Sequence, residues 1–307
     1  MLQHRPEYIM SLFNLKPASV YTGAFIIMRN FIITAGFIFC STQLIAQELY
    51  PYTEPASNMP SKSISVKASS MFGRDLHTGR IMQRHMPEVM FGLNKKWMLH
   101  AGINFSDMYN ENLIWEGARV YGKYRFLSLD EVHKHFRMAG FAAATYSRKP
   151  LPYNELNMMG DQSGVQVGLI ATQLWNKLAI SGTGGYMEIL DNDKRKTLHN
   201  DFYAQRSLNY SLSAGYLLFP LEYTNYDQTN VNLYAELLGG RNLGFDAERY
   251  YVDLAPSIQF IFKSTGKLNL GYRFELSSDI SRLSRRQFMV SYEHIFLNAL
   301  DRKKKTN

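Results

Sequence analysis

A segment near the start of the chain combines methionines and histidines, whose side chains are ligands for soft metal ions. Thioether sulfur and imidazole nitrogen together suit Cu(I), and an exposed loop could gather them around one ion. Methionine also fills apolar surfaces without a metal, and the spacing here defines no tight site. A metal site and ordinary packing therefore stay open as two interpretations. The candidate ligands are Met71, His77, Met82, His85 and Met86.

Ester hydrolysis is a second chemistry to consider, and it requires a serine activated by a histidine that a third polar group orients. Ser291 and His294 fall on opposite faces of one strand, because their separation is odd. His100 and Ser106 share a face but lie too far apart on a strand that rises roughly 3.3 Å per residue. No G-x-S-x-G motif occurs. The sequence predicts no enzyme and no cofactor, with outer-membrane lipid hydrolysis as a lesser alternative.

The elements that would position these residues are strands, because apolar side chains fall on alternate positions along most of the chain. Phe288, Val290 and Tyr292 alternate with Met289 and Ser291 near the C-terminus. A period of two indicates strands whose two faces meet different media. No later segment is apolar for long enough to form a spanning helix. The fold class predicted is all-β, a transmembrane antiparallel β-barrel of about 12 strands (10–14).

The connections between these strands sort into two kinds. The tightest turns, 94–96, 175–177 and 264–266, follow even-numbered strands, whereas the longest polar stretches, 72–84, 148–162 and 190–204, follow odd-numbered ones. Bacterial barrels keep short turns on the periplasmic side and long loops outside. Both ends of the barrel are therefore expected in the periplasm. The predicted strands are 63–71, 85–93, 97–106, 114–126, 135–147, 163–174, 178–189, 205–218, 230–241, 250–263, 267–276 and 286–296.

A secreted β-sandwich would also show alternation, but its strands usually have about five or six residues. The strands predicted here are longer, which suits tilted crossing of a hydrocarbon layer. An aromatic content of 14% fits the girdles of aromatic residues at both membrane interfaces. The barrel is therefore preferred to the sandwich.

The N-terminal residues have the order of an export signal. Met28 is the expected true start, an apolar run from Phe31 to Cys40 follows a short basic stretch, and cleavage is expected between Ala46 and Gln47. The only cysteine, Cys40, belongs to this signal. The predicted organisation is an extension and signal peptide in 1–46, a proline-containing periplasmic lead-in or short plug in 47–62, the barrel in 63–297 and a basic tail in 298–307.

The net charge of the whole chain is +8. Basic residues near anionic lipid headgroups are favourable by roughly 1 kcal/mol each. A nucleic-acid partner would suit the charge, but no recognition helix or zinc pattern accompanies it. A membrane is the expected partner, and nucleic acid is not.

The signal, the alternating strands and the last strand ending at Phe296 together resemble bacterial outer-membrane β-barrel proteins over residues 63–297. The segment TEPASNMPSKSI, Thr53–Ile64, resembles the start of uncharacterised barrels of the Bacteroidota. The resemblance implies a location in the outer membrane and contact with outer-membrane lipid and the barrel-insertion machinery. It also admits an envelope protein as a partner. Such barrels commonly end on an aromatic residue, whereas 297–307 follow Phe296 here.

If the alternate strand positions that carry apolar residues face lipid, several charged residues on the other positions must point inward. A basic residue on the lipid face near the midplane costs roughly 2–4 kcal/mol. These residues must therefore point into the barrel whatever their role. One interpretation is a basic lumen for passive passage or binding of a small, anionic solute. The alternative is a salt-bridged filling in a non-conducting scaffold or docking component of an envelope assembly. The lumen-facing candidates are Arg119, Tyr121, Lys123, Arg125, Arg137, Glu236, Arg273, Glu275 and Glu293.

Overall fold

The computed structural model describes residues 50–108, 111–148, 150, 153–191, 203–222, 227–244 and 249–301. The expected signal peptide, its cleavage site at Ala46 and Gln47, and most of the basic tail lie outside the described residues. Within these ranges no helix has the length and apolar character needed to cross a membrane.

The described residues form twelve strands, which confirms the predicted fold class. Three of them, β3, β7 and β12, have the predicted bounds, whereas β4 continues four residues beyond its predicted end at Phe126. A β-bulge between Arg125 and Leu127 shifts the register of β4, so the alternation resumes out of phase and the pattern places the end of this strand too early. The strands are β1 Ser63–Arg74, β2 Ile81–Gly92, β3 Trp97–Ser106, β4 Ile114–Asp130, β5 Lys134–Ser147, β6 Gly164–Trp175, β7 Leu178–Ile189, β8 Arg206–Phe219, β9 Asn230–Leu243, β10 Tyr250–Phe262, β11 Gly266–Ser278 and β12 Arg286–Phe296.

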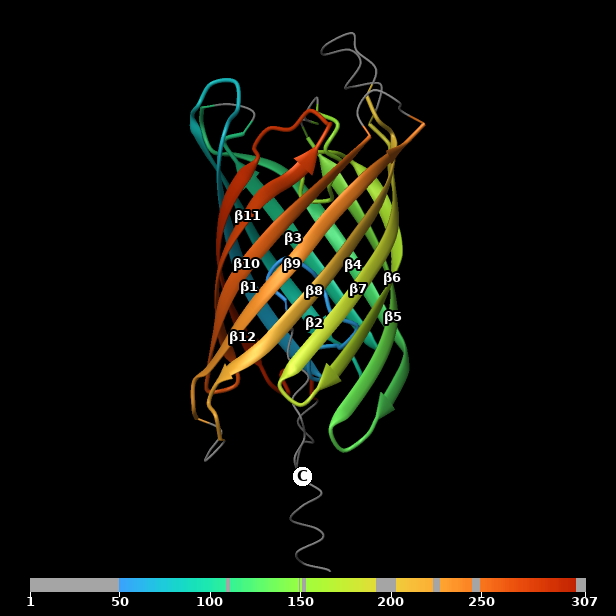
Figure 1. Ribbon diagram of the computed structural model, residues 1–307, viewed down its shortest axis with the longest axis vertical. Coiled ribbons are helices and arrows are strands. Elements are labelled where there is room, and N and C mark those ends of the chain that lie inside the picture. Colours follow the sequence, from blue (N-terminus) through green and yellow to red (C-terminus); the bar gives the residue numbers. More distant parts are fainter. Residues whose placement is uncertain are drawn as a thin grey trace, which may run out of the picture. The chain divides into compact units, whose positions relative to one another are not determined.

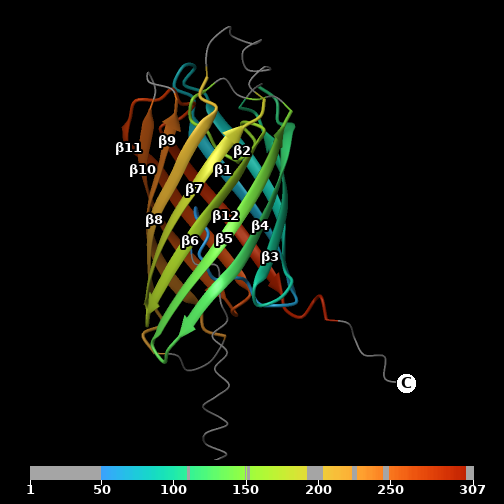
Figure 2. The ribbon, with the colours of Figure 1, turned by 90° about the vertical axis from the view of Figure 1, so that its right-hand side faces the viewer.

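The sheet closes on itself. Each strand pairs antiparallel with its neighbours in sequence, and β1 pairs with β12 from Ile64↔Phe296 to Gly73↔Gln287. Figures 1 and 2 show the resulting wall of tilted strands from two sides. Closure leaves no edge strand with unpaired backbone N–H and C=O groups. In lipid, no water would be present to form hydrogen bonds with such groups.

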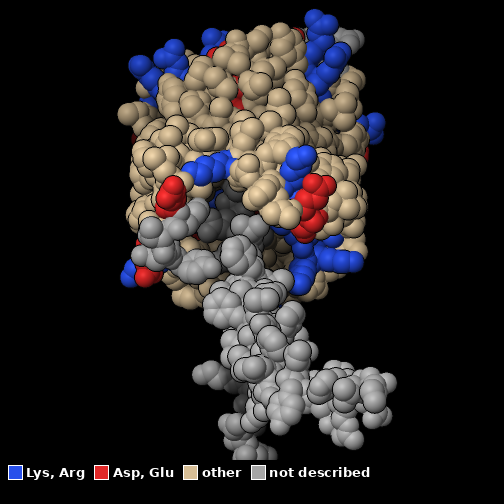
Figure 3. Space-filling view, turned by 60° about the horizontal axis from the view of Figure 1, so that its bottom comes forward, with Lys and Arg blue, Asp and Glu red and all other residues tan. Residues whose placement is uncertain are grey.

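The two faces of the wall differ in polarity. On β9 the buried Asn232 and Glu236 point inward, whereas Leu233 and Leu237 are exposed on the outside. Val120 on β4 is 58% exposed although it is apolar, which is stable only where the outer face meets hydrocarbon. Figure 3 shows the charged side chains gathered mainly toward the ends of this wall.

The connections form two groups. One end, called the short-turn end, lies where the even-numbered strands β2 to β10 end, and its described residues are 93–96, 131–133, 176–177, 220–222, 227–229 and 263–265. The other, the long-loop end, lies where the odd-numbered strands end, and its described residues are 75–80, 107–108, 111–113, 148, 150, 153–163, 190–191, 203–205, 244, 249 and 279–285. The β1–β2 connection is shorter than the predicted 72–84 because both strands extend into it, and 220–229 is longer than the other turns of its end. This asymmetry is typical of barrels whose short turns face the periplasm.

Candidate functional site

Residues 50–62, called the plug, lie inside the barrel at its short-turn end. The Tyr50 ring packs edge-on against Tyr234 of β9, with 5.6 Å between ring centroids. A Cβ at Gly271 would meet the Tyr52 ring, and one at Gly92 would overlap the Pro60 carbonyl oxygen, so glycine permits this close approach. The sequence left a periplasmic lead-in and a short plug as alternatives for 47–62, and residues 50–62 of this segment contact the inner wall. Polar groups inside the barrel pair with this segment and hold it there.

Hydrogen bonds attach the plug to β8 and β9. The backbone N–H of Tyr52 donates to Glu236 Oε1 at 3.0 Å, and Thr53 Oγ1 donates to Glu236 Oε2 at 2.6 Å. Thr53 Oγ1 also lies 2.8 Å from Ser213 Oγ. Glu236 is fully buried, so these donors replace the water that its carboxyl group loses.

The opposite wall holds the plug through Lys123 of β4. Its ammonium group donates to Glu54 Oε2 at 2.9 Å and to the carbonyl oxygens of Pro55 and Ser57 at 2.8 and 3.0 Å. All three donor hydrogens of this buried lysine therefore have acceptors, and every acceptor belongs to the plug. Arg137 adds a bond from Nη1 to Ser57 Oγ at 2.9 Å.

Residues 153–163, called the inward loop, fold into the barrel from the long-loop end. Leu156 and Met158 pack in a buried cluster with Tyr121, Met187 and other residues of the inner wall. The neighbouring Asp161 forms an ion pair with the buried Arg84 of β2. Apolar packing and an ion pair thus attach the loop to several strands of the wall.

A buried charge network anchors the same loop. Glu155 lies 2.8 Å from Arg273 and 3.0 Å from Arg282, and both guanidinium groups also contact Asp253. Although burial alone would raise its pKa, the two arginines hold the pKa of Glu155 at about 2. The carboxylates conversely raise the pKa of Arg282. The network therefore remains charged at neutral pH.

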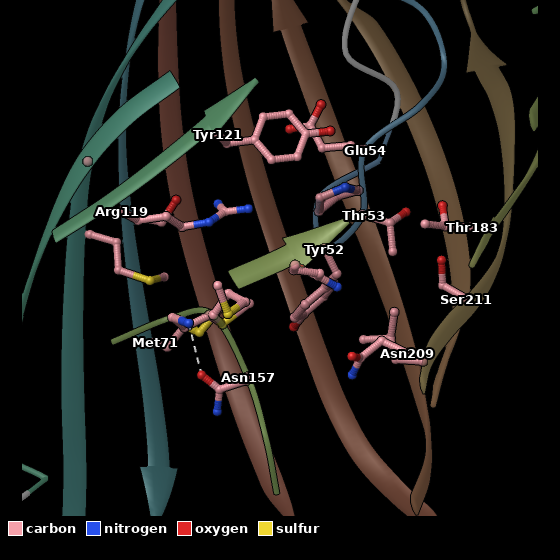
Figure 4. A pocket seen from close by; sticks show the side chains of 18 of the residues that line it. Tyr52, Thr53, Glu54, Met71, Arg119, Tyr121, Asn157, Thr183, Asn209 and Ser211 are labelled. Carbon is pink, nitrogen blue, oxygen red and sulfur yellow. Dashed lines mark hydrogen bonds between the residues drawn. The ribbon is translucent and has the colours of Figure 1, made fainter. Parts of the chain in front are cut away.

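A chamber of about 290 Å³ remains between the plug and the inward loop. Its volume is near the lower end of the 300–1,000 Å³ typical of small-ligand pockets. Figure 4 shows Tyr52, Thr53 and Glu54 of the plug, Asn157 of the inward loop and Arg119 around it. The chamber also receives six methionines: Met71, Met86, Met158, Met159, Met187 and Met289.

The nine lumen-facing candidates occupy the inner face, but they lie at different heights and form separate groups. Arg119 and Tyr121 line the chamber, where Arg119 lies 3.9 Å from Glu88. Lys123, Arg137 and Glu236 hold the plug, as described above. Arg273 and Glu275 belong to the network at the inward loop. Glu293 pairs with Lys267 at 3.2 Å, and Arg125 lies opposite the inward-facing Ala139.

The structure divides the five candidate metal ligands. Met71, Met82 and Met86 point inward, but His85 is on the outer face and contacts Ser70. His77 lies in the 75–80 connection, where it stacks with Tyr153 at 6.3 Å. The wall thus separates His85 from the methionines, and the five cannot bind one ion together. Among the described residues no group of three or more histidine, cysteine, aspartate or glutamate side chains is placed to hold a metal.

Sequence reasoning missed the methionines that do approach Met71. Met289 of β12 is its direct partner across the closure of the barrel. Their shared inward parity is visible in the sequence, but their pairing follows only from the contact between the first and last strands. Met158 and Met159 gave no periodic signal, because they belong to a loop.

The candidate serine and histidine of the last strand lie on opposite faces of the wall. Ser291 is inside, where its Oγ accepts a bond from Asn269 at 2.9 Å, whereas His294 is outside beside Phe296. The pair that does form is Ser70 with His85, whose Oγ and Nδ1 are 2.9 Å apart. It joins β1 and β2, and only the register of these strands reveals it.

Comparison with known proteins supports the architecture. No family model and no curated protein sequence matches the chain. The solved structure described as the COG4313 outer membrane channel from Pseudomonas putida F1 aligns with 81% of this chain and 100% of its own, at 12% identity and a TM-score of 0.56. The NanC porin aligns with 75% of this chain and 98% of its own, at 13% identity and 0.47, and the KdgM porin with 76% and 99%, at 8% and 0.46. The shared barrel fold and the apolar outer face place the chain in the outer membrane.

Proposed function

We propose that this outer-membrane barrel is a channel for small solutes, closed at rest by its own N-terminal plug. The observation that carries the proposal is the chamber inside the barrel, which Tyr52, Thr53 and Glu54 of the plug line on one side. A side chain filling designed only for rigidity would leave no such space, because protein interiors pack densely. The solved structure with the highest TM-score reported above is described as an outer membrane channel, which agrees with this proposal.

The plug is suited to reversible release. Its contacts include hydrogen bonds from Tyr52 and Thr53 and one ion pair through Glu54, which water can replace when the segment leaves. The plug continues directly into β1 at Ser63, so its departure breaks no strand pairing of the barrel.

Release of the plug would change the charge of the lumen. Lys123 would lose Glu54, whereas Arg137 would lose its bond to Ser57 but keep its ion pair with Asp130. Glu236 would lose the hydrogen bonds from Tyr52 and Thr53. This part of the inner wall then carries Lys123, Arg125 and Arg137 beside Asp130 and Glu236, an excess of one basic residue that favours the passage of anions. The open state is therefore expected to prefer small anionic solutes.

A reversible tether tests the channel. Thr53→Cys with Ser213→Cys replaces hydroxyls whose oxygens are 2.8 Å apart, and the only native cysteine belongs to the expected signal peptide. The Thr53→Cys substitution removes the Thr53–Glu236 hydrogen bond and so weakens the attachment of the plug. Oxidation should then lock the plug, and reduction should release it. In planar bilayers we expect silence when oxidised and anion-preferring openings when reduced.

The single variant Thr53→Cys, which cannot form this tether, is the control and should conduct equally under both conditions. Equal conductance of oxidised and reduced double variant would refute the gate. Silence of every form would favour the non-conducting scaffold instead.

The second candidate function is hydrolysis of membrane lipid esters, which one observation favours. On the outer face Ser70 Oγ lies 2.9 Å from His85 Nδ1, and His85 Nε2 lies 3.3 Å from Gln83 Oε1. With the proton on Nε2, the ring donates to Gln83 and can accept the serine proton. These are the three parts of an activated nucleophile: serine, base and orienting group.

The reaction would proceed through an acyl-enzyme. Ser70 Oγ attacks the ester carbon while His85 takes its proton, and the alcohol leaves with that proton. Interfacial water, deprotonated by His85, then releases the fatty acid and restores Ser70. Fatty-acid release by the purified barrel should fall about 10²- to 10⁴-fold in His85→Ala and should not change in Ser291→Ala, whose serine faces inward. Equal release by Ser70→Ala and the parent protein would exclude this site.

A further inference from the structure

Methionine is distributed unevenly between the two faces of this barrel. Of the twelve described methionines, ten belong to the plug, the inner face or the inward loop. Met138 of β5 lies on the outer face, and Met108 lies in the 107–113 connection. The outer face instead carries leucine, valine, isoleucine and aromatic residues, such as Leu169 and Leu212.

Apolar character alone does not explain this segregation. Leucine has a similar volume and fills apolar space with better-defined rotamers, and the chain uses it freely on the lipid face. What methionine adds to a lumen is a flexible side chain that ends in a polarizable thioether sulfur. The property shared by the interior positions is therefore a sulfur ligand as well as an apolar surface.

The thioethers converge on one side of the chamber. Met71 and Met289 are direct Cα partners across β1 and β12, and both point inward. Met86 is the diagonal neighbour of Met71, since its partner on β1 is Ser69. Such direct and diagonal pairs on one face are within reach of long side chains. Met159 of the inward loop lines the same chamber, and Figure 4 shows other sulfur atoms beside Met71.

We propose that this chamber binds a soft monovalent cation, Cu(I) or Ag(I), through the thioethers of Met71, Met86 and Met289, with Met159 completing the set. The inference goes beyond the proposed passage of anions, because the chamber holds this cation as a bound ligand beside the docked plug and does not pass it through the lumen. Neutral thioether ligands select such ions over hard cations, which require oxygen ligands.

The charges around the chamber permit a cation. Arg119 faces Glu88, and Arg273 contacts both Asp253 and Glu155. Lys67 has Glu88 and Glu293 as its register partners on the two neighbouring strands. Each basic lining residue thus has acidic neighbours. With an acidic residue beside each basic one, the chamber can accept one more positive charge bound by soft ligands.

Binding of Ag(I), which needs no reductant, tests the site directly. The full-length barrel in detergent should bind Ag(I) saturably in calorimetric titrations. Met71→Leu with Met289→Leu should weaken this binding at least tenfold, and Cu(I) measured under reducing conditions by competition with a chromogenic chelator should follow. X-ray absorption of the Cu(I) complex should show a first shell of sulfur atoms.

Met138→Leu is the matched control, because it removes a thioether from the outer face and should leave the affinity unchanged. Leucine conserves volume, and heat-modified migration in SDS gels confirms that each variant is folded. Equal affinity of the Met71/Met289 double variant and the parent, or no saturable binding by the parent, overturns the proposal. Conductance of the tethered channel in potassium chloride needs no soft metal, so a failure of this site remains distinct from a failure of the channel.

Discussion

Lys123 Nζ lies 2.9 Å from Glu54 Oε2, so a residue in the middle of the barrel wall is paired with one in the plug. Lys123 has no exposed surface, whereas the Glu54 side chain is 24% exposed. A buried cation depends on its counter-charge far more than a partly solvated anion does. This contact is therefore the most sensitive attachment of the plug.

Removing the carboxylate should release the plug. Glu54→Gln leaves a buried ammonium without its counter-charge, which costs about 3–5 kcal/mol if the plug stays docked. Release lets water reach Lys123, so we expect a higher open probability in planar bilayers. Adding Lys123→Met removes the unpaired charge and should lower the open probability again. A double variant that opens as often as Glu54→Gln would contradict this electrostatic account.

A second buried pair should matter for the stability of the wall itself. Lys267 of β11 and Glu293 of β12 lie 3.2 Å apart, and both are almost fully buried. Lys267→Met should lower the free energy of unfolding by about 3–5 kcal/mol, measured by urea denaturation in detergent. Lys267→Met with Glu293→Gln should be less destabilised than Lys267→Met alone. The result that would disprove the pairing is a double variant at least as unstable as the single one.

Acid should release the inward loop in a defined pH range. The pKa of Glu155 is lowered from 4.5 to about 2, so this residue stabilises the docked loop above about pH 4.5. The contribution is lost as the pH falls from 4.5 through 2. A nitroxide label at position 153 should stay immobile from pH 7 to 5 and become mobile at lower pH.

Glu155→Gln supplies the control for this acid transition, because its labelled loop should already be mobile at pH 7. A mobility transition near pH 6 to 7 in the parent protein would show that other groups control the loop.

An arginine should destabilise the barrel more on the outer face of a strand than at the adjacent position on its inner face. Leu212 of β8 is 54% exposed on the outer face, whereas Ser211 lines the chamber. Leu212→Arg should cost roughly 2–4 kcal/mol of folding stability in lipid vesicles, since arginine near the midplane loses its hydration. Ser211→Arg should cost less, because the lumen is polar. Equal losses at the two positions would mean that Leu212 does not face hydrocarbon.

Alternation alone determined the strands and the direction of their side chains. A residue such as Glu236 has to point inward because its neighbours Ala235 and Leu237 are apolar, and strand geometry puts consecutive side chains on opposite faces. The polar connections likewise determined which ends of the strands come together. These are local properties, so they are legible without any knowledge of distant contacts.

Only the tertiary structure decided what the inward residues meet. Lys123 finds Glu54, Glu155 finds Arg282, and Met71 finds Met289, each from a part of the chain that is remote in sequence. Proline-containing residues before β1 carry no periodic signal that distinguishes a free segment from a plug. Such pairings depend on closure of the barrel and on the space it encloses. The alternation of apolar residues along a strand gives no information about either.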